Sequence, residues 1–281
     1  MLSHSCITQT DQEESMKNFT KIAVCAMMFA GFFIVSAETI NLADKSYLRK
    51  QFGEHSATGT EFTTRGRTFL AASRPVGIDP AKKYSFKLKV TGKTEKNVRL
   101  YIGFNLMDIN GRPYQALAWQ GIASTFTVVT RAAKAGDSVI YVKNGQTWLT
   151  SAPVYIALDA KEDNSDIPNT KIVRSNVKSK VRKGDEWEIV LKTPLKADIA
   201  EGTNVRQHIA GGYFYTAVKT IKPTDGEIVL SGSVQGYAKN IGYFNGKNWP
   251  VGVKKARFLV LADWNNAGAT LNFKDAVFTI E

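Results

Sequence analysis

Two segments with an apolar residue at every second position limit the fold more than any other feature of this sequence. In the segment 84–90 the repeating apolar residues are Tyr84, Phe86, Leu88 and Val90. In the segment 98–106 they are Val98, Leu100, Ile102, Phe104 and Leu106. Successive side chains of a strand point to opposite faces, so this period of two predicts half-buried antiparallel strands.

Further segments of strand character follow along the chain, and almost no helical period appears after residue 38. They are 126–130, 138–142, 154–158, 187–193, 213–221, 227–234, 257–262 and 271–280. Turn-forming sequences separate them, among them Asp108–Gly111, Lys143–Gly145, Pro223–Gly226 and Asn245–Gly246. We therefore expect an all-β protein, an antiparallel β-sandwich or jelly roll.

The domain organisation is expected to be simple. Residues 1–37 read as upstream residues and a signal peptide, and residues 38–281 as one β-sandwich domain. An inserted β-hairpin unit is expected at about 123–158. The polar stretch 159–169 and the basic stretch 177–184 are expected to be loops, and no Pro- or Ser-rich linker divides the chain.

Residues 16–37 have the composition of a secretion signal, with Met16 as the expected start. Lys17 and Lys21 precede an apolar run of 14 residues, and small residues follow at Val35-Ser36-Ala37. This run is shorter than the roughly 20 residues that span a bilayer. We expect an exported protein, periplasmic or extracellular, without a membrane span after signal cleavage; a membrane anchor is the alternative.

The cysteine content and the net charge limit the reactions and the partners that can be expected for this protein. Both cysteines, Cys6 and Cys25, precede the expected cleavage point, which excludes disulfides and thiol chemistry from the remaining chain. The formal net charge is +12. A basic exported protein can meet anionic polysaccharide, but scattered lysines give no specific nucleic-acid site.

Signals for an enzyme are weak. The two histidines after residue 38, His55 and His208, lie far apart in the sequence, and no metal-binding His spacing, nucleophile elbow or P-loop occurs. No two carboxylates can be paired for glycoside hydrolysis. We expect no catalytic residues; if the protein is an enzyme, His208, Arg206 and Tyr213 are the candidates.

Two segments carry a resemblance to a known family. Pro80–Gly92 and the closing segment Ala269–Ile280 resemble strands of jelly-roll carbohydrate-binding modules with the galactose-binding-like fold, as found in bacterial exported proteins. In addition, Ala133–Lys143 with Trp148 is similar to a unit of bacterial extracellular polysaccharide-degrading proteins and phage adhesins. The first resemblance implies sugar binding and, often, a structural calcium ion.

Two groups of residues are candidates for stacking on sugar rings and for hydrogen bonding to hydroxyl groups. The first comprises alternate residues on the outward face of segment 98–106: Arg99, Tyr101 and Asn105. The second lies in a Gly-, Asn- and aromatic-rich stretch and comprises Tyr237, Tyr243, Asn245 and Trp249. Packing of either group against the rest of the sandwich is the alternative interpretation.

A calcium site is implied by the resemblance alone. Asp275 matches the family position, with Asp44 or Glu61 as the possible second ligand through hard oxygen atoms. The segment 40–44 departs from the family pattern. The apolar phase of the last strand also changes around Asp275, and this change predicts a β-bulge there.

Together these patterns favour an exported noncatalytic carbohydrate-binding protein whose partner is a polysaccharide, including an anionic one. A structural or adhesive cell-surface sandwich that binds a protein partner is the first alternative. A contiguous exposed apolar patch would favour that alternative. A polysaccharide-degrading enzyme is the second alternative.

Overall fold

Strands make up nearly all of the regular structure. In the computed structural model, which describes residues 37–151, 153–242 and 245–281, the elements are antiparallel strands and two single-turn 3₁₀ helices. This confirms the predicted all-β fold. The unit from Glu38 to Glu281 contains all of these elements. The expected signal peptide lies outside the described residues.

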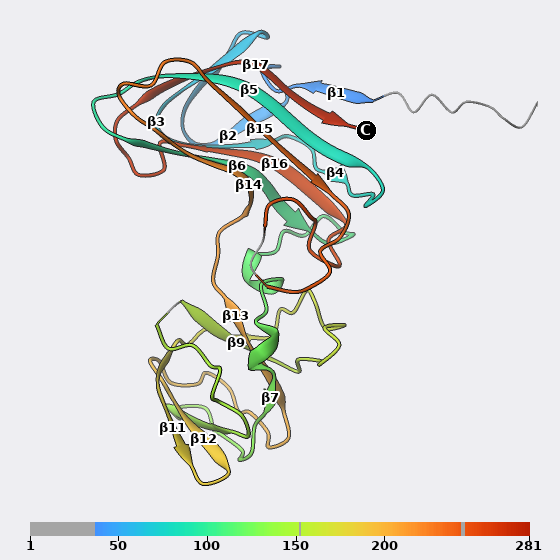
Figure 1. Ribbon diagram of the computed structural model, residues 1–281, viewed down its shortest axis with the longest axis vertical. Coiled ribbons are helices and arrows are strands. Elements are labelled where there is room, and N and C mark those ends of the chain that lie inside the picture. Colours follow the sequence, from blue (N-terminus) through green and yellow to red (C-terminus); the bar gives the residue numbers. More distant parts are fainter. Residues whose placement is uncertain (1–36, 152, 243–244) are drawn as a thin grey trace, which may run out of the picture. The chain divides into compact units, whose positions relative to one another are not determined.

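A ten-stranded sheet forms the larger part of the protein (Figure 1). Seven of its strands are hydrogen-bonded in the order β14 (Phe214–Ile221), β6 (Val98–Met107), β16 (Lys255–Ala262), β3 (Glu61–Ala72), β17 (Thr270–Ile280), β5 (Lys83–Lys93) and β15 (Ile228–Gln235). Three more strands extend it: β1 (Glu38–Asn41) pairs with β17, β2 (Leu48–Ala57) with β3, and β4 (Val76–Gly77) with β16.

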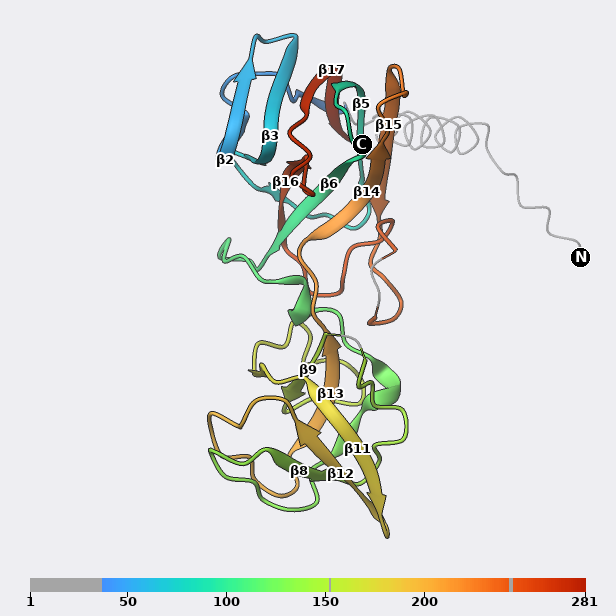
Figure 2. The same cartoon turned by 90° about the vertical axis from the view of Figure 1, so that its left-hand side faces the viewer.

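This sheet folds over into a nearly closed sandwich. The two ends of the strand order, β14 and β15, contact each other, and Figure 2 shows them side by side. Strands that are not neighbours in the sheet therefore face each other across the interior. Phe104 of β6 contacts Phe278 of β17 at 5.8 Å between ring centroids, and Phe86 of β5 contacts Phe258 of β16 at the same distance.

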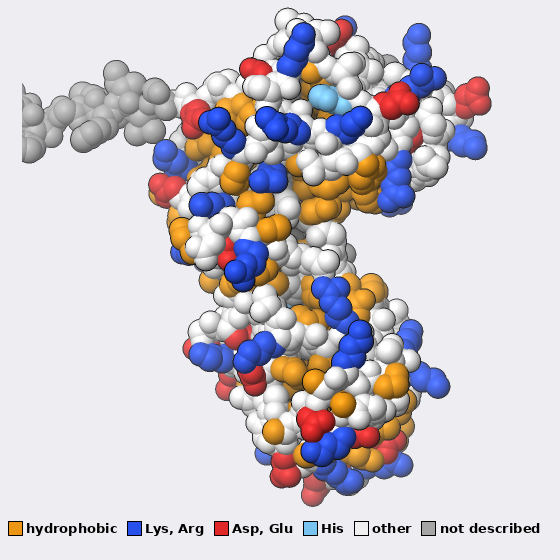
Figure 3. Space-filling view, turned by 180° about the vertical axis from the view of Figure 1, so that it is seen from behind, with side chains coloured by type: hydrophobic (Ala, Val, Ile, Leu, Met, Phe, Trp, Pro, Cys, Tyr) orange, Lys and Arg blue, Asp and Glu red, His pale blue; other side chains and the backbone are white. Residues whose placement is uncertain are grey.

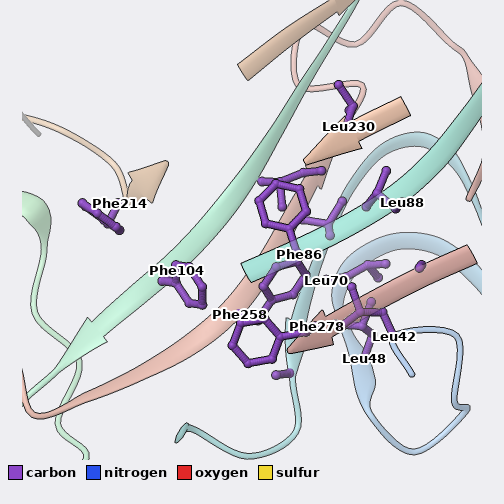
Figure 4. Close-up of a cluster of buried hydrophobic side chains, with 14 of the residues drawn as sticks. Leu42, Leu48, Leu70, Phe86, Leu88, Phe104, Phe214, Leu230, Phe258 and Phe278 are labelled. Carbon is purple, nitrogen blue, oxygen red and sulfur yellow. The ribbon is translucent and has the colours of Figure 1, made fainter. Parts of the chain in front are cut away.

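The core lies between the two layers and is rich in aromatic rings (Figure 4). Every residue of the two predicted apolar sets, in β5 and in β6, is buried in it, with at most 3% of the side chain exposed. The alternation in these segments therefore predicted the inward face of both strands correctly. Burial of these side chains supplies the main favourable free energy of folding.

Between β6 and β14 the chain leaves the sandwich and forms two smaller sheets with a second core. The four-stranded sheet has the order β10 (Ile172–Val173), β9 (Val154–Leu158), β13 (Asn204–Ile209) and β7 (Thr127–Val128). The three-stranded sheet has the order β11 (Val177–Lys183), β12 (Glu186–Leu191) and β8 (Val139–Val142). The 3₁₀ helices η1 (Ala116–Ala118) and η2 (Ala123–Thr125) precede β7.

The strand pairing contradicts the prediction of an inserted hairpin at about 123–158. Three strands lie in that range, and β8 and β9, which would form the hairpin, do not pair with each other, because each belongs to a different sheet; β7 pairs with β13. Their partners, β12 and β13, come later in the chain. The basic stretch 177–184, expected to be a loop, contains β11, which pairs with β12 over its whole length.

Candidate functional site

A series of aromatic rings lies on the outer surface of the sandwich. Neighbouring ring centroids are 4.9–6.4 Å apart, the spacing of direct aromatic contacts. Figure 3 shows hydrophobic side chains gathered in a band across the sandwich, with Lys and Arg around it. The series runs Trp264, Phe52, Phe69, Tyr213, Tyr215 and Tyr101, and we call these six side chains the aromatic face.

Cross-strand pairing aligns part of this face in one row. Directly opposite residues of neighbouring strands share a face of the sheet. The paired residues, from β2 to β14, are Phe52, Phe69, Leu261, Tyr101 and Val218. Neighbouring strands are about 4.8 Å apart, so a row across five strands is roughly 19 Å long.

Two buried leucines of β16 lie on the same side of the sheet as the aromatic face, and Leu261 is the middle position of the row. Leu259 and Leu261 of β16 are fully buried, yet they do not belong to the sandwich core, because the core side chains of β16 are on its other face. Rings of the aromatic face therefore cover them from outside. Phe52 remains 41% exposed and the other five rings are partly exposed. The aromatic face therefore lies on buried leucines, while parts of its rings remain accessible to a ligand.

Gly103 allows the close approach of β14 that brings two of the rings together. It pairs with Tyr215, and a Cβ atom on Gly103 would lie 2.0 Å from the Phe214 carbonyl oxygen. The register of β14 shifts between Tyr215 and Ala217, next to this pair. A larger residue at position 103 would push Tyr215 away from Tyr101, which lies 4.9 Å from it.

The turn after β16 holds Trp264 in place. Asp263 is fully buried, and its carboxylate accepts hydrogen bonds from the backbone N–H groups of residues 267, 268 and 269 at 2.6, 2.8 and 3.0 Å. The backbone N–H of Trp264 donates to the Arg99 carbonyl at 2.9 Å. The Asn265 side chain accepts from the Arg99 N–H at 2.7 Å and donates to the Asn97 carbonyl at 2.7 Å.

Two exposed arginines border this turn. The Arg67 guanidinium lies 4.2 Å from the Trp264 ring centroid and 6.0 Å from that of Phe52, which are cation–π contacts. Arg99 Nη1 donates to the Tyr101 hydroxyl at 3.2 Å. Both cations are therefore oriented by aromatic side chains.

The first predicted group of site residues is only partly brought together. Arg99 and Tyr101 belong to the aromatic face or border it. Asn105 is partly exposed on the same strand and pairs with Arg257 of β16, but no contact joins it to the six rings. Within the described residues, the buried Nε of Arg257 has no hydrogen-bond partner.

In the second predicted group, the prediction that Trp249 binds a ligand is wrong. This residue is fully buried in the core, where its ring contacts Phe104 at 5.0 Å and Tyr84 at 5.3 Å. It therefore cannot stack on a ligand, and it anchors the end of its loop instead. Tyr237 is partly buried and donates its hydroxyl hydrogen to the Val253 carbonyl at 3.1 Å.

The remaining members of the second group lie near a pocket. Asn245 is exposed, but its side-chain oxygen accepts from the N–H groups of Lys247 and Asn248, which shapes the turn. Tyr243 lies outside the described residues. A pocket of about 400 Å³ opens along this loop, and its lining includes Trp119, Tyr237, Lys239, Asn240, Asn245 and Asn248.

The surroundings of Asp275 do not fit a calcium ion. Its exposed carboxylate forms an ion pair with Lys89 at 2.8 Å, and this hydrogen bond lowers the pKa of Asp275. The two other proposed ligands are separate from it: Asp44 binds Ser46, and Glu61 lies 3.8 Å from Lys274. In the described part of the chain no group of three His, Cys, Asp or Glu residues is suited to a metal.

The predicted β-bulge at Asp275 is confirmed. The pairing of β17 with β5 shifts between Lys274 and Val277, and Asp275 has a φ of 48°. The apolar residues on both sides of the shift, Phe273 and Phe278, are fully buried. Asp275 therefore has a conformational role, because Asp and Asn tolerate the left-handed region better than most residues.

We expect Asp275→Asn to leave the free energy of unfolding almost unchanged, because an exposed ion pair contributes little and Asn accepts this φ. Thermal unfolding with added Ca²⁺, and again with a chelator, should give the same midpoint for this variant and the parent protein. A rise in the parent midpoint with Ca²⁺ that the variant lacks would contradict this assignment and restore the calcium site.

Two of the three suspected enzyme residues form a buried polar cluster, and the third lies elsewhere. Arg206 and His208 of β13 are fully buried, and Arg206 Nη2 forms an ion pair with Asp166 at 2.7 Å. Arg206 Nε lies 3.3 Å from His208 Nε2, and His208 Nδ1 lies 2.7 Å from the Leu117 carbonyl oxygen. The third suspect, Tyr213, belongs to the aromatic face.

Sequence reasoning missed four of the six rings, Phe52, Phe69, Tyr215 and Trp264, and it named Tyr213 only as a candidate catalytic residue. The sequence shows no clear alternation of apolar and polar residues around Phe52, Phe69 or Trp264. The alternation Tyr213, Tyr215 beside the buried Phe214 was the one available signal for an outward aromatic pair. The assembly of the face depends on strand order, which a single sequence does not reveal.

The fold and this site define an all-β sandwich protein with an aromatic outer face. Comparison of the sequence with models of known protein families finds no match, and comparison with curated proteins finds none either. None of the helices in the described residues has the length and hydrophobicity to span a membrane. The function must therefore be argued from the geometry of this chain.

Proposed function

We propose that the protein is a noncatalytic carbohydrate-binding protein and that it holds a polysaccharide on the aromatic face. The observation that carries this proposal is the aromatic face, in which six partly exposed rings are in contact and three of them share a cross-strand row with Leu261 and Val218. A row of roughly 19 Å, at about 4.8 Å per strand, accommodates several linked sugar rings.

The chemistry of the face suits sugars. Apolar aromatic surfaces pack against the C–H faces of pyranose rings, while hydroxyl groups and guanidinium groups bind the sugar hydroxyls. Burial raises the pKa of Tyr215 from its ordinary 10 to about 12, so that its hydroxyl stays protonated in mildly alkaline solution as well as at neutral pH. Tyrosine hydroxyls in this state both donate and accept hydrogen bonds.

Three expectations from the sequence belong to this proposal. They are export through the signal peptide, the resemblance to jelly-roll carbohydrate-binding modules, and the absence of a catalytic site. An exported protein without disulfides that binds polysaccharide would act at a cell surface or in the surrounding medium. The loop pocket near Asn245 would then be a secondary contact for the same polymer.

A protein partner on the same face is the second candidate function. The observation that favours it is the exposure of apolar side chains in the row: Val218 is 57% exposed and Phe52 41%. Such patches also mark protein interaction sites. The polar rim of tyrosine hydroxyls and arginines gives sugar binding the stronger support. An enzyme has the weakest support, because two of its suspected residues, Arg206 and His208, are buried, while Tyr213 belongs to the aromatic face.

Phe52→Ala and Tyr101→Ala are each expected to weaken polysaccharide binding by about tenfold or more, because truncating a central aromatic contact typically costs over 1 kcal/mol. These residues lie on two different strands of the same row, so both losses should appear with the same polymer. Affinity electrophoresis and a glycan array, with the purified protein, measure the effect.

The matched control is Val229→Ala on β15. Val229 is also an exposed apolar side chain, at 55%, but it lies on a different strand pair. Its replacement should leave binding unchanged. If the parent protein binds no glycan, or if all three variants bind equally well, the proposal is wrong and the search moves to a protein partner.

A further inference from the structure

The two arginines beside the turn of residues 263–269 have no carboxylate partner. Within the described residues, neither Arg67 nor Arg99 forms an ion pair, although Arg131 and Arg206 do. Arg67 has only its ring contacts, and Arg99 has only the Tyr101 hydroxyl as a side-chain partner. Two oriented and exposed guanidinium groups thus have hydrogen-bonding capacity to spare.

The nearest acidic side chains do not use this capacity. Asp263, next to Trp264, directs its carboxylate at three backbone N–H groups of its own turn. Glu54 is exposed two residues after Phe52, and no ion pair or side-chain hydrogen bond joins it to either arginine. The arginine charges are therefore available to a ligand.

Both arginine residues are tied to Trp264, but through different groups. The Trp264 ring contacts the Arg67 guanidinium, and the backbone N–H of Trp264 donates to the backbone carbonyl of Arg99. The Arg99 guanidinium itself donates to the Tyr101 hydroxyl. Each guanidinium group therefore borders a ring of the aromatic face, and a ligand that packs along these rings can contact both.

We propose that the aromatic face selects polysaccharides that carry carboxylate or sulfate groups, and that Arg67 and Arg99 bind these groups. This inference rests on the proposed function and names its substrate class. Guanidinium groups bind planar and tetrahedral oxyanions through paired N–H donors, which gives geometry as well as charge. The aromatic rings position the sugar, and the arginines distinguish charged from neutral chains. The formal charge of +12 assists the approach of such polymers.

Single-stranded nucleic acid also combines oxyanions with flat rings. The face favours a polysaccharide, because three of its six rings are tyrosines, whose hydroxyl groups can both donate to and accept from sugar hydroxyls. The sequence also contains no Arg- or Lys-rich arm. Nucleic acid is therefore an alternative outcome of the test and not part of the proposal.

The test compares matched polymers that differ only in charge. Homogalacturonan with free carboxylates is compared with its methyl-esterified form, and dextran sulfate with dextran, by titration calorimetry at physiological salt. We expect the parent protein to bind the charged member of at least one pair about tenfold more tightly, as charge-assisted hydrogen bonds allow. Arg67→Ala combined with Arg99→Ala should abolish this preference. Arg67→Lys should lose part of it, because lysine keeps the charge without the paired donors.

Arg182→Ala is the matched control, because it removes the same charge from an exposed position on β11, in a different sheet. It should keep the preference. The inference is overturned if this control loses the preference equally, if the double variant keeps it, or if an oligothymidylate binds more tightly than every charged polysaccharide. Equal binding of charged and neutral chains that is lost in Phe52→Ala would refute this inference alone. No binding of any polymer would refute the proposed function as well.

Discussion

Trp249→Ala should destabilise the fold by about 3–5 kcal/mol, the usual cost of removing a fully buried tryptophan. The Trp249 ring is completely buried and contacts Phe104, Tyr84 and Phe214, with centroids 5.0, 5.3 and 5.5 Å away. Truncation would leave a cavity among large rings that cannot close it by small shifts. Urea unfolding followed by circular dichroism measures the loss.

Trp249→Phe separates packing from hydrogen bonding. Within the described residues, Trp249 Nε1 has no hydrogen-bond partner although it is buried. Phenylalanine therefore loses no hydrogen bond and keeps most of the ring contacts, so its cost should be about 1–2 kcal/mol. Phe52→Ala, on the exposed face, should cost no more than about 1 kcal/mol.

Two results would contradict this assignment of Trp249. One is a loss for Trp249→Ala as small as that of Phe52→Ala, which would mean that the ring is not part of the core. The other is an unchanged fold with loss of glycan binding, which would return Trp249 to the ligand site. The experiment therefore decides between the structural and the functional interpretation of this residue.

The sandwich could be predicted because its signal is local. In β5 and β6 the alternation of apolar residues gave the inward face residue by residue, and around Asp275 the change of phase gave the bulge. In both cases the inference needs only a few neighbouring residues. The inserted segment could not be predicted in the same way, because β8 and β9 find their partners far along the chain.

Residues of the site were predicted only where the alternation within a single strand was enough to place them. Arg99 and Tyr101 were found because they alternate with core residues on β6. Phe52 and Phe69 meet through the pairing of β2 with β3, and Trp264 reaches Arg99 through backbone hydrogen bonds across 165 positions of sequence. Register between distant strands decides these contacts, and composition gives no information about it.

Two sequence interpretations failed because composition was taken as a guide to exposure. The loop before Trp249 is rich in Gly and Asn, which suggested an accessible aromatic ring, but the ring turns inward to close the core. The basic stretch 177–184 suggested a loop, but it contains β11, an edge strand of its sheet. Lysines are common on edge strands, where they discourage pairing with other chains.

Asp166→Asn should be among the most destabilising single changes in the protein, at about 3–5 kcal/mol, because it leaves a buried cation without its counter-ion. The Arg206 side chain is 1% exposed and that of Asp166 7%. Arg206 also donates to the Asn164 side chain at 2.8 Å and to the Lys161 carbonyl at 3.1 Å. These neutral acceptors remain in the variant, but they do not balance the charge.

The same cluster makes stability depend on pH through His208. Arg206 can only donate hydrogen bonds, so His208 Nε2 must accept and Nδ1 must carry the proton that it donates to the Leu117 carbonyl. The ring is therefore neutral in the folded protein. Burial, assisted by the nearby Arg206 charge, lowers the pKa of His208 to about 4 from its ordinary 6.5.

The direction in which stability changes with pH follows from the lowered pKa of His208. Above pH 6.5 the ring is neutral in both states, and the full stability is present. Between pH 6.5 and about 4 the unfolded chain binds a proton that the folded protein does not, so stability falls as the pH falls. The loss accumulates to about 3 kcal/mol at most, since one pKa unit corresponds to about 1.4 kcal/mol.

Urea unfolding of the parent protein and of His208→Asn at several pH values isolates this contribution. Asparagine keeps one donor for the Leu117 carbonyl and does not titrate, so the variant should be less stable at pH 7 but lose less stability on acidification to pH 4.5. His55, whose pKa is also lowered by burial, has the same sign and stays in both proteins, so the difference between the two curves belongs to His208. Parallel curves would mean that His208 has the same pKa in the folded and the unfolded protein, so that both bind its proton near pH 6.5. In that case the ring deduced to be neutral from the donors of Arg206 would be charged at lower pH, and Asp166 would there balance two cations rather than one.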